Sequence, residues 1–268
     1  MREIRVRRLW SQDRPAVNGW LHIPCGWAAE LMAHQGWDSL TVDLQHGPVG
    51  FDPCVAMFQA MAATEVTPLA RVPWNDPGWI MRVLDAGAMG IICPLVNSRE
   101  ECERFVGACR YPPQGYRSMG PTRVGLYAGP DYVEHANQAV IAMAMVETRE
   151  ALERVEEIVA TPGLDAVYIG PSDLSMSLRG RPGLDFTDSE MLDAIRTVAR
   201  AARAQGVIPG IHCGSPQYAR RMVAEGFRFV TLLSDGRLLA NAARAVLAAM
   251  RAPDTERPSA PRPETGPY

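Results

Sequence analysis

Residues 43–48 read Asp43-Leu44-Gln45-His46-Gly47-Pro48, an acid and a histidine followed by a Gly-Pro pair that ends any regular element. The preceding residues 39–42 are short, apolar and β-branched, as expected of a buried strand. The acid and the histidine therefore stand where a strand passes into a loop, and in an α/β barrel that place is the catalytic face. The alternative is a capped turn with a hydrogen-bonded histidine, which this stretch alone would favour.

The same pattern recurs along the chain, where eight apolar runs alternate with segments of helical spacing. Alternation implies parallel strands covered by helices, and eight strands imply a closed (β/α)8 TIM barrel of the α/β class. No Gly-x-Gly-x-x-Gly follows the first strand, which weakens the dinucleotide-fold alternative. The expected strands are residues 17–23, 40–44, 68–72, 90–96, 139–146, 164–169, 207–212 and 227–233.

The barrel domain is expected to span residues 15–251, without a break that would mark a second domain. Residues 1–14 are interpreted as a polar, loosely held arm. Residues 252–268 hold five prolines and almost no apolar bulk, a composition typical of a disordered tail. A long irregular stretch at 111–130 is rich in Gly, Pro and Arg, and such loops are typically functional or disordered.

Composition excludes several classes of function. The chain has 268 residues and a net charge of −3 without a basic tract, which argues against nucleic acid or an anionic membrane as a partner. No apolar run is long enough to span a bilayer, and no apolar core follows the basic residues at the N-terminus. A cytoplasmic location is therefore expected. None of the six cysteines forms Cys-x-x-Cys, so they are interpreted as buried free thiols.

The sequence contains no lysine, and arginine holds its proton too tightly to act as an amine nucleophile. A lysine Schiff base is therefore excluded, whatever the fold. An enzyme of this sequence that makes a carbanion next to a carbonyl group must stabilise it with a metal ion or another electrophile.

Polar side chains stand at the carboxyl ends of the expected strands, which converge on one mouth in a barrel although they lie far apart in the sequence. They are Asp43, His46, Arg71, Glu147, Asp173, His212, Ser234 and Asp235.

Glu147 and Asp173 follow neighbouring strands, where two carboxylates would repel each other unless a cation lies between them. Two oxygen ligands suit Mg²⁺ or Mn²⁺, with water and substrate oxygens completing an octahedron, and Co²⁺ or Zn²⁺ are alternatives. The spacing leaves other interpretations open, because Asp173 could instead be the N-cap of a helix and Glu147 could begin a capped helix.

Arg71 ends the third strand, where a guanidinium can form a structural ion pair or hold a carboxylate or a developing oxyanion. Asp85 lies near the end of an expected helix, where the helix dipole disfavours an acid. That misfit suggests a cationic partner such as His46, although the sequence alone favours a solvated surface acid.

Six motifs occur in order and at suitable distances, and together they resemble the HpcH/HpaI family of divalent-metal-dependent pyruvate aldolases. This family includes 4-hydroxy-2-oxoheptanedioate aldolase and 2-keto-3-deoxy-sugar-acid aldolases, and the resemblance covers roughly residues 17–250. The motifs are Asp43-Leu44-Gln45-His46-Gly47, Arg71-Val72-Pro73, Leu84-Asp85-Ala86-Gly87-Ala88, Arg110-Tyr111-Pro112-Pro113-Gln114-Gly115, Val146-Glu147-Thr148 and Ile169-Gly170-Pro171-Ser172-Asp173-Leu174-Ser175.

The resemblance implies a role for each matching position. Glu147 and Asp173 would bind the metal, and Arg71 would stabilise the enolate oxygen. His46 would be the base and Asp85 the acid that raises its basicity.

The turn Gly170-Pro171-Ser172-Asp173 would hold the pyruvate carboxylate. The resemblance also implies a homo-oligomer, as dimers and hexamers, with a C-terminal helix exchanged between neighbours. Two departures put the substrate preference and the lid in doubt: Met145 stands where the family often has glutamine, and Ser118 where it tends to have glycine.

The expected function is a metal-dependent aldolase that cleaves or forms the C3–C4 bond of a 4-hydroxy-2-oxo acid, with pyruvate and an aldehyde as the other reactants. One alternative keeps the enolate site but decarboxylates oxaloacetate or cleaves an acyl-CoA in the manner of a citrate lyase. A second alternative is a non-catalytic barrel that binds a small 2-oxo acid.

Overall fold

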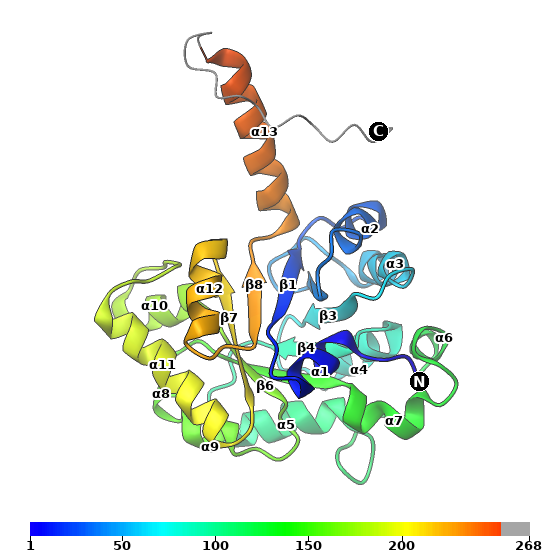
Figure 1. Ribbon diagram of the computed structural model, residues 1–268. Helices are drawn as coiled ribbons and strands as arrows, with labels where there is room; N and C mark the ends of the chain where they lie inside the picture. Colours follow the sequence, from blue (N-terminus) through cyan, green and yellow to red (C-terminus); the bar gives the residue numbers. More distant parts are fainter. Residues whose placement is uncertain (253–268) are drawn as a thin grey trace.

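The computed structural model describes residues 1–252 and shows a closed barrel of eight parallel strands, each paired with the next in sequence and β8 paired with β1 (Figure 1). The predicted (β/α)8 barrel is therefore confirmed. The predicted tail lies outside the described residues, except for residue 252. The strands are β1 (Ala16–Leu21), β2 (Ser39–Asp43), β3 (Thr67–Arg71), β4 (Gly90–Cys93), β5 (Ile141–Val146), β6 (Ala166–Ile169), β7 (Ile208–Cys213) and β8 (Phe229–Leu232).

Helices cover the outside of the barrel and connect its strands (Figure 1). The helical segment after β5 divides into two at Arg154, and α6 lies within the stretch 111–130 that was expected to be irregular. The helices are α1 (Arg5–Ser11), α2 (Gly26–Ala33), α3 (Phe51–Met61), α4 (Pro77–Ala86), α5 (Arg99–Cys109), α6 (Arg123–Ala128), α7 (Tyr132–Ala139), α8 (Arg149–Glu153), α9 (Val155–Val159), α10 (Pro171–Arg179), α11 (Ser189–Ala204), α12 (Pro216–Ala224) and α13 (Asp235–Arg251).

The strands are buried along most of their length because both faces of the sheet are covered. All six residues of β5 are buried, as are all residues of β2 and β3. The strand register fixes the level of the polar residues at the strand ends. Asp43 is the register partner of Arg71, and Val146 that of Ile169, so Glu147 and Gly170 leave their strands at the same level.

The N-terminal segment is held more firmly than its polar sequence indicated. Val6 and Leu9 on α1 are buried, and Val6 donates its backbone N–H to the hydroxyl of Thr67 at the start of β3. Arg7 pairs with Asp165, which precedes β6, at 2.8 Å. The prediction of a loosely held arm is therefore wrong for residues 5–11. Val6 and Leu9 are three residues apart, so they lie on one face of this short helix, and both are buried in the core.

The last helix, α13, extends away from the barrel (Figure 1). Of its residues only Asp235 is buried, while Leu239, Val246, Leu247 and Met250 are all more than half exposed. Within residues 1–252, no helix is both long and apolar enough to cross a membrane.

Candidate active site

A cavity of about 400 Å³ opens at the carboxyl ends of the strands, the end of a TIM barrel that carries catalytic residues. Its size is typical of a small-molecule site. Eight of the residues expected at this mouth from the sequence line it, namely His46, Arg71, Gly170, Pro171, Ser172, Asp173, His212 and Ser234.

Arg71 and Asp43 form a two-point ion pair in the wall of this cavity. Arg71 Nε donates to Asp43 Oδ1 at 2.9 Å, and Arg71 Nη2 donates to Oδ2 at 2.6 Å. Burial alone would raise the pKa of the Asp43 carboxyl, but hydrogen bonds from His22 and Arg71 outweigh burial and hold this pKa well below its usual range. The aspartate is therefore ionised, and it fixes the plane and direction of the guanidinium.

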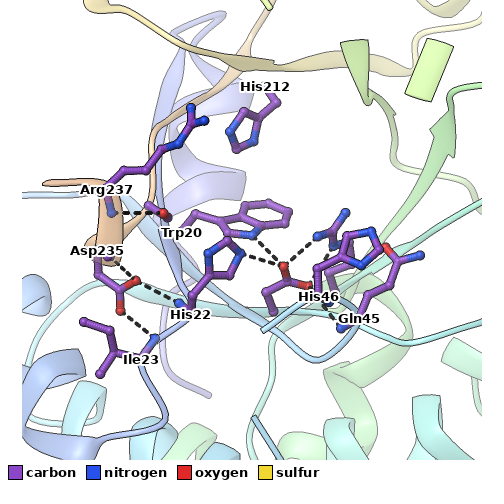
Figure 2. A network of polar contacts seen from close by, with 12 residues as sticks. Trp20, His22, Ile23, Gln45, His46, His212, Asp235 and Arg237 are labelled. Carbon is purple, nitrogen blue, oxygen red and sulfur yellow. Dashed lines mark hydrogen bonds and ion pairs between the residues drawn. The ribbon is translucent and has the colours of Figure 1, made fainter. Parts of the chain in front are cut away.

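The Asp43 carboxylate also bonds to neighbouring polar groups, which belong to Trp20, His22, Gln45 and His46 (labelled in Figure 2). Its Oδ2 accepts hydrogen bonds from the indole of Trp20 at 3.1 Å and lies 2.8 Å from Nε2 of His22. Its Oδ1 accepts from the backbone N–H groups of Gln45 at 3.1 Å and His46 at 3.3 Å. The structure therefore shows the capped turn that the sequence offered as one alternative, and this turn places the exposed His46 ring at the cavity. The catalytic role of the stretch stays a prediction.

Glu147 lies beneath the cavity floor at the end of β5. Its Oε1 accepts the backbone N–H of Leu95 at 2.8 Å, and only 2% of the residue is exposed. A Cβ atom added to Gly170 would lie 2.4 Å from Oε2 of Glu147. Only glycine at position 170 therefore lets the glutamate carboxylate lie against the end of β6.

Burial raises the pKa of Glu147 to about 7; the Leu95 N–H lowers it, and the charge of Asp173 raises it further. The negative charge of Asp173 therefore acts on the Glu147 carboxylate, and their role as a metal-binding pair stays a prediction. Asp173 lies in the first turn of α10 and is not its N-cap, which is Gly170. The helix-cap interpretation of Asp173 is therefore wrong.

These two carboxylates fit a hard divalent cation. Within residues 1–252, Glu147 Oε2 has no protein hydrogen-bond donor, and both acids lack a basic partner within ion-pair distance. No group of three or more His, Cys, Asp or Glu side chains that could hold a metal ion occurs among the same residues. A cation here would accordingly have two protein carboxylates, with the remaining positions open to water and substrate oxygens.

Asp85 does not join the cavity. Its Oδ1 accepts from Arg117 Nη2 at 2.6 Å, and Arg117 Nη1 donates to the hydroxyl of Tyr132 at 2.8 Å. Burial raises the pKa of Asp85, and the hydrogen bond from Arg117 offsets only part of that effect. The cationic partner that the helix-dipole argument predicted exists, but it is Arg117 instead of His46. Arg117, from the irregular stretch 111–130, is fully buried.

Several residues of the cavity wall were not predicted from the sequence. His22, Trp20 and Tyr168 line it, as does Arg237 at the start of α13. His22 lies inside the expected strand 17–23, but β1 ends at Leu21, so in the structure His22 follows the strand directly. The rule that polar residues follow strand ends missed it because the expected strand was two residues too long. Trp20 and Tyr168 sit within strands, where an aromatic side chain is indistinguishable from core.

Comparison of the sequence with known protein families identifies the family of this chain. Residues 26–242 match the family model described as HpcH/HpaI aldolase/citrate lyase. The chain is therefore a member of the HpcH/HpaI family and an enzyme of the carbon–carbon lyase class.

Particular relatives agree with this assignment. A hydroxypyruvate/pyruvate aldolase of Rhizorhabdus wittichii is 43% identical over 92% of this chain and 99% of its own length. A 4-hydroxy-2-oxo-heptane-1,7-dioate aldolase of Klebsiella pneumoniae is 37% identical over 88% of this chain and 89% of its own. The crystal structure of a family member from Burkholderia cenocepacia J2315 superposes with a TM-score of 0.86 at 31% identity, over 92% of this chain and 98% of that one.

Proposed function

We propose that this enzyme cleaves, or in reverse forms, the C3–C4 bond of a 4-hydroxy-2-oxo acid, with pyruvate and an aldehyde as the products of cleavage. The observation that carries the proposal is the arrangement of opposite charges around one cavity. The ion-paired Arg71 faces it from β3, while Glu147 follows β5 and Asp173 lies in the first turn of α10, near enough for its charge to raise the pKa of Glu147. The relatives named as pyruvate aldolases support the same reaction.

Glu147 and Asp173 would hold a divalent cation, most simply Mg²⁺ or Mn²⁺, which would withdraw electrons from the keto oxygen of the substrate. The substrate carboxylate would bind at the amino end of α10. There the first backbone N–H groups, those of Ser172 and Asp173, have no intrahelical partner, and the helix dipole favours an anion. The hydroxyl of Ser172 donates to the carbonyl of Gly183 at 3.1 Å, so it holds the loop over this turn.

Arg71 would stabilise the charge that develops on the keto oxygen. Its pair with Asp43 uses only part of its N–H donors, and those that remain can face the cavity. Because Asp43 fixes the guanidinium before substrate arrives, the donors need no reorganisation during the reaction. Such preorganised donors typically contribute about 10²- to 10³-fold in rate.

His46 would act as the general base. Its ring is exposed at the cavity mouth, and it would take the proton of the C4 hydroxyl directly or through one water molecule. The electrons of the O–H bond then form the aldehyde carbonyl, and those of the C3–C4 bond form the enolate of pyruvate. Asp85 remains the acid proposed to support His46, although within the described chain it accepts a hydrogen bond from Arg117.

The cavity volume helps to rank the alternatives. A site of about 400 Å³ suits a small 2-oxo acid, and it is small for an acyl-CoA. Decarboxylation of oxaloacetate would use the same groups and remains the second candidate reaction, because it also passes through the enolate of pyruvate.

The test is to load the protein with Mg²⁺ or Mn²⁺, add candidate 4-hydroxy-2-oxo acids and couple the released pyruvate to lactate dehydrogenase. EDTA, Glu147→Gln and Arg71→Ala should each abolish the signal. Matched surface variants, Glu100→Gln and Arg99→Ala, should keep it, because those side chains are 75% and 45% exposed. Pyruvate release that survives all three treatments would overturn the proposal.

We also propose that the enzyme is a cytoplasmic homo-oligomer built from dimers, with a hexamer as the expected assembly. The apolar side chains of α13 that project into solvent support it, because a single chain leaves them uncovered. Light scattering after size exclusion should give a multiple of the 29.4 kDa chain mass. A monomer at micromolar concentration would contradict this proposal.

A further inference from the structure

The cavity has a second arginine, and it lies away from the carboxylate pair. Arg237 stands in the first turn of α13 and lines the cavity together with His22 and His212. Its side chain extends beside His212, above Trp20 (Figure 2). The two arginines differ in their partners, because Asp43 neutralises Arg71 whereas no carboxylate of residues 1–252 lies within ion-pair distance of Arg237.

The start of α13 is anchored although the rest of the helix projects from the barrel. Asp235, which is 5% exposed, accepts the backbone N–H of His22 at 2.9 Å and that of Ile23 at 3.1 Å. The hydroxyl of Ser234 caps the helix by accepting the N–H of Arg237 itself at 3.4 Å. The backbone of Arg237 is therefore fixed relative to the loop between β1 and α2. Its side chain starts from this fixed point at the mouth of the cavity.

The side chains near Arg237 add hydrogen-bonding capacity without negative charge. His212 lies 3.1 Å from the hydroxyl of Tyr168 through Nδ1. Burial, together with the positive charges of Arg71, His22 and Arg237, lowers the pKa of His212 to about 4. Asp173 thus lines one side of the cavity, next to Gly170 and the buried Glu147, and Arg237 lines the other beside a neutral imidazole.

We propose that Arg237 is a specificity-determining residue that binds a carboxylate on the aldehyde half of the substrate. This inference rests on the proposed function, which places the 2-oxo acid at Glu147, Asp173 and the start of α10. The aldehyde half must then extend toward the remaining wall, where Arg237 has no carboxylate partner among residues 1–252. A guanidinium there selects an anionic aldehyde over a neutral one because it offers two parallel N–H donors to a carboxylate.

The test compares two aldehydes of similar length, 4-oxobutanoate and pentanal, as acceptors for pyruvate. The wild-type enzyme should prefer 4-oxobutanoate in kcat/KM. Arg237→Gln should lower kcat/KM for 4-oxobutanoate by about 10- to 100-fold, chiefly through KM, and change the value for pentanal less than about threefold. Arg237→Lys should restore part of the preference. Arg244→Gln, on the same helix but bonded to Asn241, should change neither value.

A separate measurement distinguishes the two proposals. The exchange of pyruvate methyl protons with deuterated water, followed by NMR without an aldehyde, reports enolate formation alone. Exchange that persists in Arg237→Gln, with a selective loss for 4-oxobutanoate, supports the role of Arg237. The role of Arg237 is overturned if exchange persists but Arg237→Gln loses kcat/KM equally for both aldehydes. It is also overturned if the wild-type enzyme shows exchange but no preference for 4-oxobutanoate over pentanal. Either result leaves the proposed function standing. Absence of exchange in the wild type overturns both.

Discussion

Arg71 and Asp43 are register partners on neighbouring strands, and their side chains meet in two hydrogen bonds of 2.9 and 2.6 Å at the mouth of the barrel. The ring of Trp20 lies under the guanidinium, 4.9 Å from its central carbon. The arginine is therefore held in its plane by a carboxylate and on one face by an indole. Its remaining donors are directed by groups that themselves take no part in the proposed bond cleavage.

Asp43→Asn tests this positioning. An amide can accept a hydrogen bond from Arg71 through its oxygen, but its NH₂ group faces the second donor, so the two-point contact is lost. We expect kcat/KM for pyruvate release to fall by about 100-fold, and the free energy of unfolding to fall by roughly 3 kcal/mol. Coupled assays and urea denaturation measure the two effects.

Asp38→Asn is the matched control for Asp43→Asn. Asp38 also pairs with an arginine, Arg5, at 2.8 Å, but it precedes β2 at the opposite end of the barrel. Its replacement should lower stability and leave kcat unchanged in the folded protein. Equal losses of activity in both variants would show that Asp43 acts only through stability.

Gly170→Ala tests the carboxylate pair without removing a carboxylate. The added methyl group would lie 2.4 Å from Glu147 Oε2, so the glutamate must move. We expect the affinity for Mn²⁺, measured by calorimetry, to fall at least about tenfold, with stability reduced by roughly 1–3 kcal/mol. Gly125→Ala meets no atom within 4 Å and should change neither quantity. Unchanged Mn²⁺ affinity in Gly170→Ala would place the cation elsewhere.

The sequence could predict the barrel and the residues that follow its strands, because the period of apolar runs and the polar residues at their ends are local patterns. Arg71, Glu147 and Asp173 were found in this way. The hydrogen-bond partners of these side chains were not predictable, because they depend on the strand register and on the paths of the loops. Asp43 bonds to His22, which follows β1, as well as to Arg71 of β3. Asp85 bonds to Arg117, which comes from a segment without a regular pattern.

Asp85→Asn separates a structural role from a catalytic one. The substitution leaves the fully buried Arg117 without a counter-charge, so the free energy of unfolding should fall by roughly 1–3 kcal/mol, the lower part of the range for broken buried pairs because Asp85 is 26% exposed. If Asp85 also supports His46, as proposed, the pH profile of kcat should shift in the folded variant. An unchanged profile with reduced stability would leave Asp85 a purely structural residue.

The pKa of His212 predicts how stability depends on pH. In the folded protein burial and the charges of Arg71, His22 and Arg237, partly offset by Asp43, lower this pKa from 6.5 to about 4. Between these two pH values the unfolded chain binds a proton that the folded chain does not, so the free energy of unfolding falls as the pH falls. Above pH 6.5 the imidazole is neutral in both states, and its effect vanishes.

His212→Gln removes this proton without removing the hydrogen-bonding partner of Tyr168. We expect the wild type to lose about 3 kcal/mol more stability than the variant between pH 7 and pH 4. Urea denaturation at a series of pH values measures the difference, and His34→Gln, an exposed histidine after α2, is the control. Parallel curves for the wild type and His212→Gln would mean that His212 accepts its proton in the folded enzyme.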